Sequence, residues 1–107
     1  MVKLENTFNE LSPVPEEGKE AVYQAMKSKN VRVELIRSGY SETPSKIYDQ
    51  DENEFVMIID GSAELFFEEG NQTIQMLAND FVNIPAHSRH RVNKVRKDTY
   101  WLAVFYK

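Results

Sequence analysis

The chain of 107 residues contains no cysteine, which excludes disulfide bonds, thiolate metal ligands and cysteine nucleophiles. Glycine occurs only four times, and no glycine-rich phosphate-binding loop is present. No apolar run approaches the roughly 18 residues of a membrane-spanning helix, and the N-terminus lacks an apolar signal core. Acidic residues outnumber basic residues 17 to 13, which argues against nucleic acid and anionic membranes as partners. These absences predict a cytoplasmic protein.

The composition is that of one globular domain. The apolar fraction of 41% and the charged fraction of 28% lie near the averages for folded proteins, which does not favour disorder. A chain of this length closes one hydrophobic core. Within the domain, the pattern of apolar residues separates an N-terminal extension over residues 1–30 from a β-rich barrel region over residues 31–107.

The N-terminal extension predicts one short helix. Pro15 suits the first turn of a helix, and the apolar run ends at Asn30. Because the helix is short, we expect it to persist only by packing on something larger. Four apolar residues repeat at helical spacing in this stretch: Ala21, Val22, Ala25 and Met26.

From residue 31 onward the apolar period changes to two, which is typical of β-strands. The stretches 55–59 and 100–106 are apolar on both faces, as expected of strands covered on both sides. Gly70 and Asn71 supply the positive φ angles of a tight hairpin whose return strand is 72–77. Many short strands after one small helix predict an all-β sandwich or barrel.

Two motifs have spacings that resemble those of the cupin superfamily. Glu54 is followed seven residues later by Gly61, as in the first cupin motif. Asn79 leads after six residues to Pro85, and Pro85 leads after five to His90, as in the second motif. The resemblance implies a cupin double-stranded β-helix, that is, a jelly-roll barrel, preceded by the short N-terminal helix.

The match covers roughly residues 31–106, but the motifs depart from the family pattern at several positions. Where the first motif has two histidines, this chain has Tyr48 and Gln50. In the second motif His87 replaces a glycine. His87 has the opposite strand parity to His90, so we predict a histidine at the rim of the barrel rather than a second ligand.

Glu54 and His90 are the candidate site residues, because each is expected to point into an otherwise apolar barrel. A buried carboxylate and imidazole need a partner. The first candidate is a divalent metal, namely iron, zinc, nickel or manganese, with Gln50, Glu54 and His90 as ligands. The second is a direct hydrogen bond between Glu54 and His90, and the third is a bound substrate or a water network. With a metal, Tyr48 is the catalytic candidate that positions substrate or donates a proton.

Two functions therefore remain open. One is a metal-dependent oxygenase, isomerase or lyase acting on a small organic molecule, which is what the resemblance implies. The other is a non-catalytic barrel that binds or senses a small-molecule ligand without metal. The aromatic residues of the last strand cover both of its faces, so its outer face needs the N-terminal helix or a second subunit as cover. Because cupins often dimerise through such a sheet, the resemblance also implies a homodimer.

Overall fold

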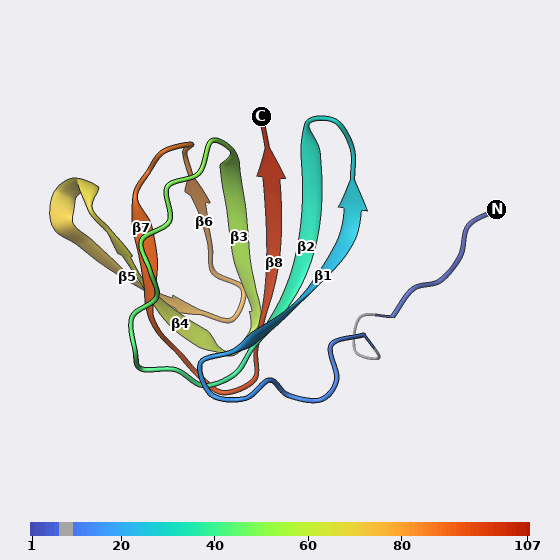
Figure 1. The fold of residues 1–107 in the computed structure, drawn as a ribbon, viewed down its shortest axis with the longest axis horizontal. Helices are drawn as coiled ribbons and strands as arrows, with labels where there is room; N and C mark the ends of the chain where they lie inside the picture. Colours follow the sequence, from blue (N-terminus) through green and yellow to red (C-terminus); the bar gives the residue numbers. More distant parts are fainter. Residues whose placement is uncertain (7–9) are drawn as a thin grey trace.

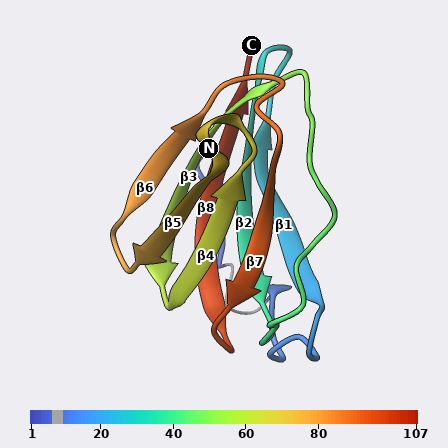
Figure 2. The ribbon, with the colours of Figure 1, turned by 90° about the vertical axis from the view of Figure 1, so that its left-hand side faces the viewer.

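Eight β-strands form two antiparallel sheets in the computed structural model, which describes residues 1–6 and 10–107 (Figure 1). The larger sheet has the strand order β1-β2-β8-β3-β6, and the smaller sheet has the order β5-β4-β7. Figure 2 shows the smaller sheet lying across the larger one, so the sheets are the two layers of the fold. The strands are β1 (Glu20–Lys27), β2 (Val31–Ser38), β3 (Asn53–Asp60), β4 (Ser62–Phe67), β5 (Gln72–Leu77), β6 (Phe81–Ile84), β7 (His90–Val95) and β8 (Thr99–Tyr106).

The core lies between the two sheets and is built from alternate residues of the strands. Val56 and Ile58 of β3 are buried, and so are Ala63, Leu65 and Phe67 of β4. This alternation is the period of two that the sequence shows, because successive side chains of a strand point to opposite faces. The expected all-β class is confirmed, and so is the hairpin, in which β4 pairs with β5.

Several turns between strands contain residues with positive φ angles, among them Gly70 and Asn71 in the expected hairpin. Gly61, between β3 and β4, has a φ of 106°, and a Cβ at this position would lie 2.4 Å from Thr99 Oγ1. Asn79 and His87 have φ angles of 76° and 64°. Both therefore adopt the left-handed conformation that the cupin pattern assigns to glycine.

The expected N-terminal helix is wrong, because residues 20–27 form strand β1. β1 pairs with β2 along its whole length, so its backbone groups bond to a neighbouring strand rather than within a helix. Exposure alternates along it, with Ala21, Tyr23 and Ala25 partly buried and the residues between them exposed. The spacing of small apolar residues in this stretch suits both structures, and pairing with the free edge of β2 favours the strand.

The outer face of the larger sheet is apolar across four strands. Val33 lies opposite Val104, Phe55 lies opposite Val104, and Met57 lies opposite both Leu102 and Phe81. Phe81 is 56% exposed. Since the expected helix is a strand of the same sheet, it does not cover this face.

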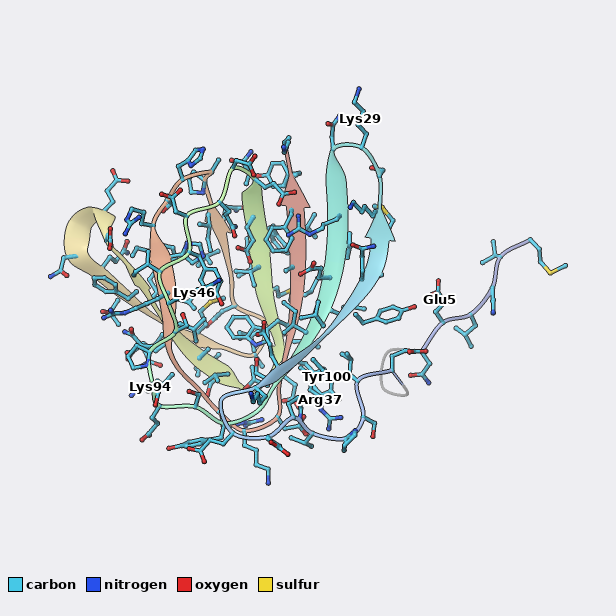
Figure 3. The ribbon with its side chains drawn as sticks, viewed as in Figure 1. Glu5, Lys29, Arg37, Lys46, Lys94 and Tyr100 are labelled. Atoms are coloured by element: carbon cyan, nitrogen blue, oxygen red, sulfur yellow. The ribbon has the colours of Figure 1, made fainter. Side chains whose placement is uncertain are left out.

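The N-terminal segment crosses one end of the larger sheet. Leu11 is buried there, and its carbonyl oxygen accepts a hydrogen bond from Arg37 Nη1 at 3.1 Å. Arg37 lies over the ring of Tyr100, and Figure 3 labels the two side chains next to each other. In the described part of the chain, no helix is long and apolar enough to cross a membrane.

Candidate functional site

A cavity of about 650 Å³ opens between the two sheets. One wall of the cavity is formed by the segment over residues 39–52, which connects β2 to β3 and runs past β7 (Figures 1 and 2). This segment is attached to β7 by backbone pairs, Ser41 with Val95 and Tyr48 with His90. The volume lies within the range of roughly 300–1,000 Å³ that is usual for small-molecule sites.

His90 is the first residue of β7 and its side chain is only 7% exposed. Its Nδ1 lies 2.7 Å from the carbonyl oxygen of Ser88. Because a carbonyl oxygen only accepts, Nδ1 carries the proton and donates it to Ser88. The imidazole stacks against Phe67, with ring centroids 5.7 Å apart, and tilts against Tyr48 at 5.8 Å. In the neutral ring, Nε2 is therefore a hydrogen-bond acceptor held in a fixed direction.

Glu54 lies on β3, and its side chain is 12% exposed. Its Oε1 accepts a hydrogen bond from Gln50 Nε2 at 2.9 Å. Burial raises the pKa of Glu54, because a carboxylate loses hydration inside the protein, while the Gln50 hydrogen bond and His90 act in the opposite direction. Glu54 thus keeps its proton to a higher pH than an exposed glutamate.

Glu54 and His90 face each other in this cavity, one from each sheet. Glu54 Oε1 and His90 Nε2 are 3.9 Å apart, which is too long for a hydrogen bond. The direct hydrogen-bonded pair that the sequence left open is therefore not formed. The gap leaves the imidazole acceptor available to a group bound in the cavity.

Tyr48 and Gln50 also line the cavity, whereas His87 does not. Burial, and then the Glu20 and Glu54 carboxylates, raise the pKa of the Tyr48 hydroxyl, so this phenol stays protonated. The His87 side chain is 68% exposed, and its Nδ1 lies 2.9 Å from Asp49 Oδ1 at the protein surface.

Sequence reasoning missed the polar wall that β2 contributes to the site. Arg32 and Glu34 line the cavity, and Val33 points outward between them. The register shows why, since Glu34 lies opposite Ala103, which is buried in the core. The alternation in β2 shows two unlike faces but does not show which of them turns inward, so no local signal identified this wall.

The residues present offer an incomplete site for the divalent metal that the cupin resemblance implies. Structural and catalytic zinc sites take three or four protein ligands. Here Glu54 and His90 supply one carboxylate and one imidazole, and Gln50 presents its amide nitrogen to Glu54 rather than an oxygen to a shared ion. Among residues 1–6 and 10–107, no three histidine, aspartate or glutamate side chains converge on one point suited to a metal ion. The donor set does not fit a closed metal centre.

Comparison with solved structures finds proteins of the same fold. A Ralstonia eutropha protein with the provisional name mannose-6-phosphate isomerase is 31% identical, matches over 99% of both chains and has a TM-score of 0.84. A cupin superfamily protein of Desulfitobacterium hafniense is 17% identical over 86% of this chain and 81% of its own, with a TM-score of 0.73. A DMSP lyase of Ruegeria pomeroyi is 16% identical over 82% of this chain and 47% of its own, with a TM-score of 0.72. No family model and no curated protein matches the sequence.

Proposed function

The chain belongs to the cupin superfamily, and we propose that it binds a small polar organic molecule between its sheets and moves a proton on that molecule with Glu54 and His90. The proposal needs no bound metal. The observation that carries it is the buried pair itself, with Glu54 Oε1 and His90 Nε2 separated by 3.9 Å in the cavity. A separation of this size leaves both groups within reach of one bound ligand.

His90 is the base in this proposal. Its Nδ1 proton is committed to the Ser88 carbonyl oxygen, so Nε2 is the nitrogen that takes a proton from the ligand. The rings of Phe67 and Tyr48 hold the imidazole in place, which limits the rearrangement that proton transfer requires.

Glu54 is the acid, because burial raises its pKa and so increases the fraction of Glu54 that holds a proton. For a ligand with a C–H bond next to a carbonyl group, His90 removes the carbon-bound proton and Glu54 donates a proton to the carbonyl oxygen. When the deprotonated carbon carries a hydroxyl group, His90 returns the proton to the former carbonyl carbon and the hydroxyl group gives its proton to Glu54. This completes an isomerisation, restores both side chains and needs no oxidant or second substrate. The name isomerase, given provisionally to the Ralstonia protein, agrees with this class of chemistry.

Proton exchange in D₂O tests the proposal directly. A panel of small hydroxy-aldehydes, hydroxy-ketones and amino-ketones is incubated with protein purified without a metal-affinity tag, and loss of the C–H signal is followed by NMR. We expect the wild type to exchange at least one compound and His90→Gln to lose about 10²–10⁴-fold in rate. His87→Gln is the matched control, since it changes the other histidine at an exposed position. Equal exchange by wild type and His90→Gln contradicts the proposal.

A metal-dependent oxygenase, isomerase or lyase is the second candidate, because Glu54 and His90 face one point in the cavity and Gln50 lies beside them. Elemental analysis of the tag-free protein separates the two candidates. Iron, zinc, nickel or manganese at near one ion per chain, falling in both Glu54→Ala and His90→Ala, would move the function to the metal-dependent candidate. Full exchange activity after treatment with a chelator supports the metal-free reaction.

A further inference from the structure

Three side chains that line the cavity, those of Arg32, Gln50 and Trp101, donate hydrogen bonds to other protein groups. Arg32 donates from Nε to Glu34 Oε2 at 3.1 Å and from Nη1 to Glu52 Oε1. Trp101 Nε1 donates to Ser38 Oγ at 3.0 Å. Gln50, as described above, donates to Glu54. The donor groups of these three side chains are therefore already engaged when a ligand enters the cavity.

The acceptors in the same cavity remain available. His90 Nε2 lies on a side chain that is more than nine-tenths buried, and the distance to Glu54 Oε1 is too long for a hydrogen bond. Glu54 has a second carboxylate oxygen, and the Glu34 side chain is 19% exposed and lines the same wall. A ligand that satisfies these atoms must donate hydrogen bonds to them.

The acidic and basic side chains that line the cavity differ in how far they are exposed. The Glu34 and Glu54 side chains are 19% and 12% exposed, and Glu20, which also lines the cavity, is more exposed. Partial burial and then the Glu34 carboxylate raise the pKa of Glu20. Arg32 is the one basic side chain among the partly buried lining residues of the described chain, and it is shared between Glu34 and Glu52. The other two basic lining residues, Lys19 and Lys94, are exposed. Lys94 is labelled in Figure 3, and its Nζ lies 3.9 Å from Glu64 Oε1.

We infer that the ligand of this cavity is a small organic cation that carries N–H donors, such as a protonated primary amine. This inference rests on the proposed function and names its ligand class. The ammonium group lies against the Glu34 carboxylate, which leaves Glu54 and His90 Nε2 for the proton transfer, and Trp101 and Phe105 line the space for the rest of the molecule. A phosphate would meet carboxylates here and an arginine that is already paired, so the substrate named for the Ralstonia protein does not suit this cavity.

A charge-matched series tests the inference. Cyclohexylamine, cyclohexanol and cyclohexanecarboxylate share one ring and differ in charge at neutral pH. Binding is followed by the fluorescence of Trp101, the single tryptophan of the chain, and by calorimetry. We expect the amine to bind at least about tenfold tighter than the alcohol, and its affinity to fall as salt is added. Glu34→Gln should weaken the amine about threefold to tenfold and leave the alcohol unchanged. Glu69→Gln removes the same charge from the turn after β4 and should change neither.

The outcomes separate this inference from the proposed function. Tighter binding of the carboxylate, of the alcohol or of mannose 6-phosphate than of the amine overturns the inference, and so does an amine that fails to saturate the protein. If such a neutral or anionic ligand is lost in His90→Gln, the proposed function stands without the cation. If the amine binds and depends on Glu34 but His90→Gln exchanges C–H protons as fast as the wild type, the ligand class stands and the proton-transfer role fails.

Discussion

Replacing Glu54 by glutamine keeps the shape of the side chain and removes its charge, so it isolates the free-energy cost of placing a carboxylate in the cavity. Taking an ion out of water costs several kcal/mol, and with 12% of the side chain still exposed we take about 3 kcal/mol here. The Gln50 hydrogen bond is worth about 1–1.5 kcal/mol more to a carboxylate than to an amide. Glu54→Gln should therefore stabilise the protein by about 1–2 kcal/mol at pH 7, which lies in the range that single stabilising substitutions commonly give.

The effect should depend on pH with a definite sign. Burial holds the pKa of Glu54 above its ordinary value of 4.5, so the folded protein keeps this proton at pH values where the unfolded chain has released it. The contribution of Glu54 to stability is thus fully present below that value and is lost as the pH rises through the folded-state pKa. The advantage of Glu54→Gln should shrink towards zero at pH 4, because the carboxyl is then protonated in both states.

Urea unfolding at pH 7 and pH 4, followed by circular dichroism, measures both numbers. In a separate thermal unfolding experiment at pH 7, the midpoint should rise by about 4–8 °C for each kcal/mol gained in a domain of this size. Glu69→Gln, at an exposed turn, should change the free energy of unfolding by less than about 0.5 kcal/mol at either pH. A Glu54→Gln protein that is less stable at pH 7, or equally shifted at both pH values, would refute the reasoning.

Three further perturbations test the frame around the site. Gly61→Ala should cost more than about 2 kcal/mol in urea unfolding, since its Cβ would clash with Thr99; an unchanged midpoint contradicts the tight packing. Ser38→Ala should cost about 1–3 kcal/mol and shift the emission of Trp101, because the buried indole N–H loses its acceptor. We also propose that the chain forms a homodimer through the apolar outer face of the larger sheet. Light scattering should give twice the chain mass of 12.5 kDa for the wild type and a single chain mass for Phe81→Glu. A monomeric wild type excludes this dimer.

The sequence predicts most strands because their chemistry is local. Alternation between apolar and polar residues marks β4, and the positive-φ residues Gly70 and Asn71 mark its hairpin. It predicts β1 wrongly because small apolar residues at this spacing suit a helix and a strand equally. What decides between them is the free edge of β2, which is a tertiary contact that no local pattern records.

The sequence likewise predicts one part of the candidate site and misses another. The spacing from Glu54 to Gly61 and from Pro85 to His90 placed both functional side chains in one cavity. The wall formed by Arg32 and Glu34 could not be foreseen, because alternation shows that β2 has two unlike faces but not which face turns inward. In β2 the apolar face is the outer one, so the polar face looks into the protein.

The segment over residues 39–52 fixes the backbone of two cavity positions independently of their side chains. Tyr48 N donates to His90 O at 2.7 Å, His90 N donates to Tyr48 O at 3.1 Å, and Gln50 O accepts from His87 N at 2.7 Å. Because these are main-chain bonds, they persist when the side chains at 48 and 50 are exchanged. The double substitution Tyr48→His with Gln50→His would add two imidazoles on a frame that already holds Glu54 and His90, enough ligands for a divalent ion. Two substitutions should therefore be enough to give this fold a site for a divalent metal ion. A cobalt titration of the double variant would measure the affinity of that site.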